Sequence, residues 1–250
     1  MERDTNKLIM FDYGGIVEEY STIGRRIYDY RDVFVDALMW ACGLRVPDNY
    51  DWDKWRREHF DWMNSHSFTG NEFIGFCSEE ERKAALAKVL DEICVTHASK
   101  EAVDMYIQYI RNHAPLVPTN KEMINLQIET KEKCLIGGMT NIGVDWLPTF
   151  RKVTETISYD YVFESCIARA MKPDPMAYIA VEEMSGLSGK QILLIDDNCF
   201  NVVSAIQHGW CAYWVSLDNY DTIVSQVREA VTYFLNNDGA CYLTSMPVQK

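Results

Sequence analysis

The chain has 250 residues and a formal net charge of −13, and 48% of its residues are hydrophobic. This length and apolar content suffice for one large domain or two smaller ones, and they exclude a mainly disordered chain. The acidic balance and the lack of a Lys/Arg cluster argue against a nucleic-acid or membrane-surface partner, and no apolar run approaches the roughly 20 residues of a bilayer span.

Eight cysteines are scattered along the chain without a Cys-x-x-Cys pair. In a chain of this size, that spacing predicts reduced thiols rather than a disulfide framework or a zinc site. The first seven residues are mostly polar or charged and lead directly into an apolar segment, which does not fit a signal peptide. These features predict a cytoplasmic protein.

The first predicted strand covers residues 8–11, four apolar residues in a row. Such a run is typical of a strand that is buried on both faces of a parallel sheet. The run ends at Asp12, and the glycines at positions 14 and 15 allow the backbone to turn sharply and approach a ligand closely. Open α/β sheets place their chemistry at the carboxyl ends of the strands, so Asp12 is a candidate functional residue.

From residue 21 to about residue 114 the pattern becomes helical. Apolar residues at helical spacing predict helices over 24–44, 86–93 and 99–110, and no strand pattern interrupts them. Pro115 and Pro118 end this stretch. We therefore predict an all-helical domain over 21–114, inserted into a core domain formed by 1–20 and 115–250. The sequence leaves three roles open for the aromatic residues of the insert. They could pack in its core, contact a substrate or form a homodimer surface.

After residue 115 strands and helices alternate. A capping box over 119–122 predicts a helix to about residue 131. Further helices are predicted over 145–153, from Asp174 to just before Gly186, up to about residue 209, and over 221–235. The intervening strands are predicted over 134–139, 159–163, 191–195 and 212–215. Repeated β–α units with apolar strands predict an α/β fold, a Rossmann-like parallel sheet with helices on both faces.

Polar residues follow three of these predicted strands, and the carboxyl ends of parallel strands meet at one edge of a sheet. They are Asp12, the pair Thr140 and Asn141, and the pair Asp196 and Asp197. Lys172 precedes a helix and can reach the same edge. Clustered carboxylates repel one another unless a cation neutralises them, and oxygen ligands select Mg²⁺. A carboxylate beside Mg²⁺ can attack phosphorus, while Lys and Thr stabilise the phosphoryl oxygens.

Four segments, in this order, resemble the motifs of the haloacid dehalogenase (HAD) superfamily of phosphohydrolases. Residues 11–17 resemble its nucleophile strand, 139–141 its second motif, 171–178 its lysine motif and 195–202 its acidic metal motif. The helical insert stands where many members carry a C1 cap domain. The resemblance implies a Mg²⁺-dependent phosphatase that hydrolyses a small phosphate ester, such as a sugar phosphate or a nucleotide, through an aspartyl-phosphate intermediate.

The resemblance also implies roles for individual residues. Asp12 would be the nucleophile and a metal ligand, Gly14 would offer its backbone carbonyl to the metal, and Asp197 would be the direct acidic ligand. Asp196 and Asn201 would complete the metal site. Phosphate would be bound by Gly14, Gly15, Thr140, Asn141 and Lys172.

Position 14 departs from the family pattern, because most family phosphatases carry an aspartate there as general acid and base. Losing such a group typically costs about 10²–10⁴ in rate. Two alternatives therefore stay open beside the phosphatase. One is a catalytically weak or silent binding or regulatory protein, and the other is a 2-haloacid dehalogenase, which uses the same aspartate without a metal.

Overall fold

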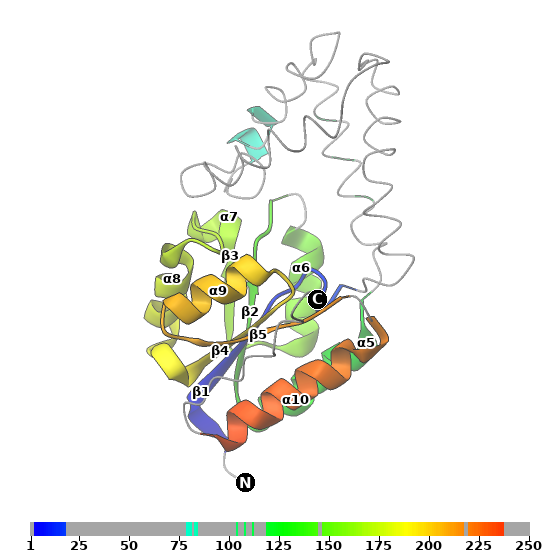
Figure 1. Cartoon of the computed structure of the whole chain (residues 1–250). Helices are drawn as coiled ribbons and strands as arrows, with labels where there is room; N and C mark the ends of the chain where they lie inside the picture. The colour runs from blue at the N-terminus through cyan, green and yellow to red at the C-terminus, as the bar shows by residue number, and fades with distance from the viewer. Residues whose placement is uncertain are drawn as a thin grey trace, which may run out of the picture.

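The computed structural model describes residues 3–18, 79–81, 83, 84, 104, 108, 112, 119–144, 147–217 and 220–237 (Figure 1). A five-stranded parallel sheet with the order β3-β2-β1-β4-β5 forms its centre. The strands are β1 (Asp4–Phe11), β2 (Cys134–Thr140), β3 (Tyr161–Glu164), β4 (Ile192–Asp196) and β5 (Cys211–Trp214). The predicted parallel α/β fold is confirmed.

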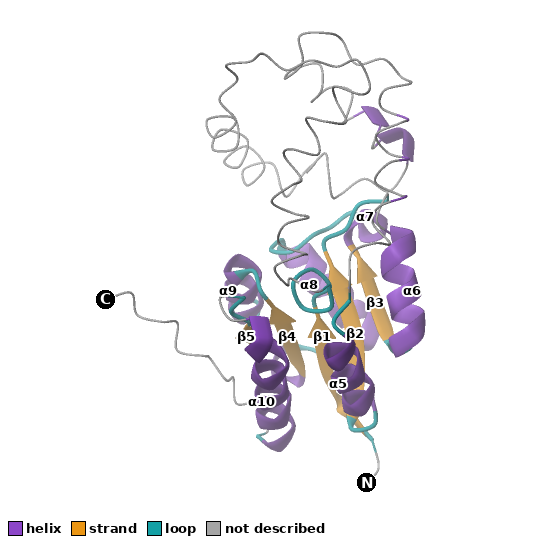
Figure 2. Cartoon of the chain, turned by 90° about the vertical axis from the view of Figure 1, so that its right-hand side faces the viewer, coloured by secondary structure: helices purple, strands orange, loops and turns teal. Residues whose placement is uncertain are grey.

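Helices cover both faces of this sheet (Figure 2). They are α5 (Lys121–Lys131), α6 (Leu147–Ile157), α7 (Ser165–Ala168), α8 (Pro175–Ser185), α9 (Cys199–Gln207) and α10 (Ile223–Asn236), with short 3₁₀ turns at Gly189–Gln191 and Tyr220–Thr222. Side chains alternate along β1, so that Leu8 and Met10 pack against α8 and α9. Ile9 and Phe11 pack on the other face, against α5, α6 and α10. The central strand is therefore buried on both faces, as its apolar run predicts.

The predicted helix ends at α8 are confirmed. The Asp174 side chain caps this helix by accepting a hydrogen bond from the amide of Met176, and Pro175 occupies the first turn. Gly186 ends the helix in the left-handed conformation, with φ of 70°. These signals are local, so a sequence pattern is enough to find them.

The predicted capping box at 119–122 is wrong by one residue. Asn120 caps α5, and its side chain accepts a hydrogen bond from the amide of Met123. Thr119 instead forms an antiparallel bridge with Glu18. Because the backbone of Thr119 is held in this bridge, the helix starts one residue later than its sequence suggests.

The Glu18–Thr119 bridge joins the end of the described segment 3–18 to the start of the described segment 119–144. Beside it, the amide of Asn120 donates to the carbonyl oxygen of Val17 at 2.8 Å. The Tyr220 hydroxyl donates to the carbonyl oxygen of Glu18 at 3.2 Å. The segment that ends at Glu18 and the segment that begins at Thr119 are therefore hydrogen-bonded to each other. Tyr220, which precedes α10, binds the first of them.

Most of the predicted 21–114 domain lies outside the described residues. Its described members are helical, namely 79–81, 83, 84, 104, 108 and 112. The domain boundaries stay a prediction. No helix within the described ranges combines the length and the apolar character that crossing a bilayer requires.

Candidate active site

Lys172 is the centre of a buried polar cluster at the carboxyl edge of the sheet. Its side chain is fully enclosed, and its Nζ lies 2.9 Å from Oδ1 of Asp12 and 2.6 Å from Oδ2 of Asp196. A third hydrogen bond, of 2.7 Å, goes to the carbonyl oxygen of Met139. An ammonium has three donors, so the protein accepts all of the hydrogen bonds that Lys172 can offer. Burial alone would lower the pKa of Lys172, but the two aspartates outweigh it and raise that pKa above its ordinary value.

The backbone of Lys172 is held by the side chain of Asn141. The Oδ1 atom of Asn141 accepts from the Lys172 amide at 2.9 Å, and its Nδ2 donates to the Lys172 carbonyl oxygen at 2.6 Å. The hydroxyl of Ser204 on α9 donates to the carbonyl oxygen of Pro173 at 2.6 Å. The loop before α8 is thereby tied both to the end of β2 and to α9, which fixes where the Lys172 side chain begins.

Asp196, the last residue of β4, is completely buried and receives its hydrogen bonds from the protein. Besides Lys172, the Nδ2 atom of Asn201 lies 3.0 and 3.1 Å from its two oxygens. The backbone amide of Asn198 donates to Oδ1 at 2.8 Å. Asn198 also caps α9 through its side chain. Asp196 therefore links Lys172 to the first turn of α9.

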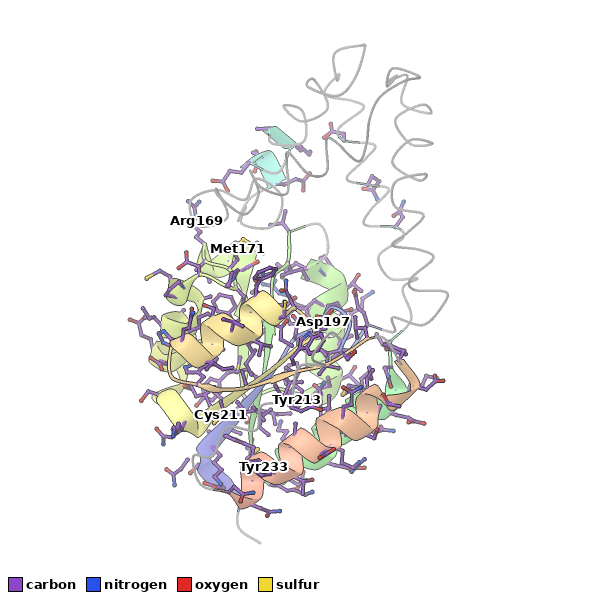
Figure 3. All side chains as sticks on the ribbon, in the orientation of Figure 1. Arg169, Met171, Asp197, Cys211, Tyr213 and Tyr233 are labelled. Carbon is purple, nitrogen blue, oxygen red and sulfur yellow. The ribbon has the colours of Figure 1, made fainter. Side chains whose placement is uncertain are left out.

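Asp197 lies against the glycine turn that follows β1. A Cβ atom at Gly15 would stand 2.7 Å from Oδ2 of Asp197, and the φ of Gly15 is +68°. Both the close contact and the left-handed backbone require glycine at this position. The backbone of Asp197 is held in turn by the Trp214 indole, whose Nε1 donates to its carbonyl oxygen at 2.8 Å. In Figure 3 Asp197 lies at the end of the sheet opposite to Cys211, where β5 begins.

The three aspartates, which we call the acidic cluster, are Asp12, Asp196 and Asp197. Each offers a carboxylate oxygen, and these oxygens lie within 4.8 Å of one another. Burial raises the pKa of Asp12 to about 6, against the opposing effect of Lys172 and with a further increase from Asp196. Burial and then the two other aspartates raise the pKa of Asp197 to about 8. One ammonium thus does not neutralise this group of acids.

A hard divalent cation fits this donor set. Three ionised carboxylates and one ammonium leave two negative charges, which such a cation balances, and every donor is an oxygen. The Oδ1 atom of Asn201 adds a buried acceptor that has no hydrogen-bond partner among the described residues. The residues present therefore suit Mg²⁺ by charge and by ligand type.

Similarity to known proteins was found among solved structures. No family model and no curated protein matches the sequence significantly. The chain is similar to the L-2-haloacid dehalogenase of Xanthobacter autotrophicus, with 19% identity and a TM-score of 0.54 over 84% of this chain and 77% of that one. A defluorinating L-2-haloacid dehalogenase gives 19% identity and a TM-score of 0.58 over 90% of this chain and 95% of that one. A HAD family enzyme from Bacteroides thetaiotaomicron, in complex with magnesium and inorganic phosphate, gives 14% identity and a TM-score of 0.51. The match covers 85% of this chain and 96% of that one.

The chain has the HAD fold. Within this fold the structure brings together the residues that the sequence assigned to the metal and the nucleophile. Asp12, Asp196, Asp197 and Lys172 converge, Asn201 contacts Asp196, and Gly15 contacts Asp197. The roles of these residues stay predictions.

The predicted phosphate ligands are placed less uniformly. Thr140 is buried at the end of β2, next to Met139, whose carbonyl oxygen binds Lys172. Asn141 lies beside the cluster, but its amide is bonded to the backbone of Lys172. Gly14 is half-buried in the turn after β1.

The sequence did not predict four residues that hydrogen-bond to the residues of the site or to the loop that carries Lys172. They are Met139 with its carbonyl oxygen, Asn198 with its backbone amide, Ser204 with its hydroxyl and Trp214 with its indole. Asn198 carried a usable signal, since an Asn directly before a helix is a common cap. The other three act through contacts between distant segments, for which one sequence gives no pattern.

Proposed function

We propose that this protein is a HAD-type hydrolase, a Mg²⁺-dependent phosphatase that acts on a small phosphorylated metabolite. The observation that carries the proposal is the charge of the acidic cluster, three converging carboxylates with one buried ammonium. An excess of acids suits a site for a divalent cation and a phosphate group, because the carboxylates hold the cation and the cation offsets the charge of the phosphate.

Asp12 is the proposed nucleophile. Its backbone amide donates to the carbonyl oxygen of Ile195 at 2.9 Å, and its Oδ1 atom is held by Lys172. The carboxylate is thereby oriented before the substrate binds, which is the geometric part of nucleophilic catalysis. One of its oxygens would attack the phosphorus and form the aspartyl phosphate, and water would then hydrolyse this intermediate.

The carboxylates of Asp12 and Asp197 and the carbonyl oxygen of Gly14 would hold Mg²⁺, with Asp196 and Asn201 behind them. The ion, when bound, would neutralise the oxygens of the phosphate group. Thr140 and the backbone of Gly15 would contact the phosphate. Lys172 would keep Asp12 in place and offset the charge that develops on the phosphoryl oxygens, and Asn141 would act through the Lys172 backbone that it holds.

The test is release of p-nitrophenol from p-nitrophenyl phosphate with and without Mg²⁺. The native protein is expected to turn over with Mg²⁺, to lose activity in EDTA and to regain it when the ion is restored. Asp12→Asn is expected to lose all measurable turnover, while Asp221→Asn, on the exposed surface, retains it. Activity of Asp12→Asn equal to that of the native protein would refute Asp12 as nucleophile.

A dehalogenase is the second candidate, because two of the similar solved structures carry that activity in their names. The charge of the cluster argues against it. A 2-haloacid is itself an anion and would enter a site whose carboxylates carry more negative charge than the one ammonium neutralises. Chloride release from L-2-chloropropionate in EDTA would favour the dehalogenase.

Bound Mg²⁺ without turnover on a broad panel of phosphate esters would favour the silent binding protein.

A further inference from the structure

The acidic cluster offers no spare side-chain proton among the described residues. All three N–H bonds of Lys172 point to acceptors of the protein. Asp12 and Asp197 must be ionised to attack phosphorus and to bind a cation. The Tyr13 ring packs edge-on against Phe150 in the hydrophobic core, with 5.1 Å between the ring centres. Among the described residues, Lys172, Asp12, Asp197 and Tyr13 therefore do not supply a proton to an alkoxide that leaves phosphorus.

Gly14 is the second residue after Asp12, and its position has room for a side chain. A Cβ atom at this position would meet no heavy atom of the described residues within 4 Å, whereas one at Gly15 would collide with Asp197. Positive φ angles occur at Gly15, Gly186, Gly189 and Gly209, and Gly14 is not among them. Neither packing nor backbone conformation thus requires glycine at position 14. The missing side chain is a chemical feature of the site, two residues after the proposed nucleophile.

We infer that the site takes phosphoryl compounds whose leaving group departs as a stable anion without receiving a proton. This inference rests on the proposed function. The shared chemistry belongs to aryl and enol phosphates, acyl phosphates and phosphoric anhydrides. Alkyl phosphates, including those of sugars and nucleosides, have strongly basic leaving groups and are poor substrates for such a site.

The bonds and charges balance without an acid. An oxygen of Asp12 forms a bond to phosphorus while the bond from phosphorus to the leaving oxygen breaks. The leaving oxygen keeps the electron pair and departs as an anion. Water then attacks the phosphorus of the aspartyl phosphate, the bond between Asp12 and phosphorus breaks, inorganic phosphate is released, and the proton of the water passes to the solvent.

The decisive measurement compares kcat/KM for phenyl phosphate and benzyl phosphate in Mg²⁺. The two esters are similar in size, but phenoxide is a far weaker base than the benzyl alkoxide. Since general acid catalysis is typically worth about 10²–10⁴-fold, we expect kcat/KM to favour the phenyl ester by about that factor. Equal values would overturn the inference, because an acid elsewhere in the chain would then protonate the leaving group. No turnover of either ester or of p-nitrophenyl phosphate would refute the proposed function itself.

Two variants at position 14 locate the effect. Gly14→Asp adds a carboxyl group in the open space and is expected to narrow the phenyl-to-benzyl ratio by about tenfold or more. Gly14→Ala adds the same Cβ atom without a proton donor and is expected to keep the native ratio, whatever its absolute rate. Circular dichroism checks that both variants fold. A folded Gly14→Asp variant with the native ratio would overturn the assignment of this effect to Gly14.

Discussion

The acidic cluster and a second carboxylate site, the Glu182 site on α8, contrast in their hydrogen-bond balance. At the Glu182 site one carboxylate accepts from the Trp210 indole at 3.0 Å and from the Gly189 amide at 3.2 Å, and it lies 3.4 Å from Nε2 of His208. Burial alone would raise the pKa of Glu182, but these partners outweigh it and lower the pKa below its ordinary value. In the acidic cluster, burial and mutual repulsion raise the pKa values of Asp12 and Asp197.

This contrast separates a carboxylate that the protein stabilises in its ionised form from a group of carboxylates whose pKa values are raised by burial and by one another. The protein itself supplies the donors that stabilise the ionised form of Glu182. The acidic cluster has more negative charge than its one ammonium neutralises, so we expect a bound cation to stabilise it. The variants below change one side of this comparison at a time.

The largest loss in the free energy of unfolding is expected from Lys172→Met, which removes the ammonium and keeps a long, unbranched side chain. Asp12 and Asp196 are then buried side by side without a cation, and breaking a buried ion pair costs about 3–5 kcal/mol. Urea unfolding at pH 7 without Mg²⁺ measures this loss. Lys190→Met, on the exposed surface, is the control and should change the free energy of unfolding little. Equal losses in the two variants would mean that Lys172 does not hold the cluster together.

Thermal unfolding should depend on pH and Mg²⁺ together. The folded-state pKa values of Asp12 and Asp197, about 6 and about 8, lie above their ordinary values. Their protonated forms therefore stabilise the fold at low pH, and this stability is lost as pH rises toward 8. Mg²⁺ binds the ionised forms and should raise Tm more at pH 8 than at pH 5.5.

At 100 times its Kd the ion contributes about 2.7 kcal/mol, or roughly 5–10 °C for a chain of this size. Asp197→Asn removes one of the two titrating acids, so it should flatten the pH dependence and reduce the gain from Mg²⁺. NaCl at matched ionic strength controls for general screening. An increase of Tm by Mg²⁺ that is equal at pH 5.5 and pH 8 would contradict the assignment of the cluster as a cation site.

Asn141→Ala tests whether the position of Lys172 depends on the amide that holds its backbone. The substitution removes two partly buried hydrogen bonds, so we expect a loss of about 1–3 kcal/mol in the free energy of unfolding. We also expect a fall in kcat that exceeds any change in KM, because a displaced Lys172 no longer orients Asp12. Ser204→Ala removes one bond from the same loop and should cost less in both measurements. Native kcat in Asn141→Ala would show that Asn141 does not position Lys172.

The smallest effect is expected from Glu182→Gln, which keeps the shape of the side chain and removes its charge. Hydrogen bonds to a charged acceptor then become neutral ones, so the variant should lose about 1 kcal/mol at pH 7. Because the pKa of Glu182 is lowered, this stability is present above its ordinary value of 4.5 and is lost as pH falls below it. Urea unfolding at pH 7 and pH 3.5, with the exposed neighbour Glu183→Gln as control, should show the difference only at the higher pH.

The sequence predicted the acids of the site better than their supports. An apolar strand that ends on a carboxylate is a local pattern. It correctly placed Asp12 and Asp196 at the edge of the sheet where the strands have their carboxyl ends. The brace between Asn141 and Lys172 joins residues that are 31 positions apart, and its geometry depends on the loop that enters α8. A single sequence carries no pattern for such a contact.

Element boundaries failed where local patterns were weak. β1 begins at Asp4 rather than near Leu8, because its first half is polar and largely exposed. α6 continues to Ile157, four residues beyond its predicted end, since Val153 and Ile157 are both buried while the residues between them are polar. The four residues of α7 are too few to show a helical period.

The bridge between Glu18 and Thr119 brings together two backbone positions that are far apart in the sequence. The segment that follows β1 and the segment that precedes α5 are therefore adjacent in space. We expect a shorter or longer stretch between residues 18 and 119 to leave the strand order and the acidic cluster unaltered, because the bridge and the Asn120–Val17 hydrogen bond hold these two positions together. The length of the chain between them is then free to vary while the sheet that carries Asp12 stays the same.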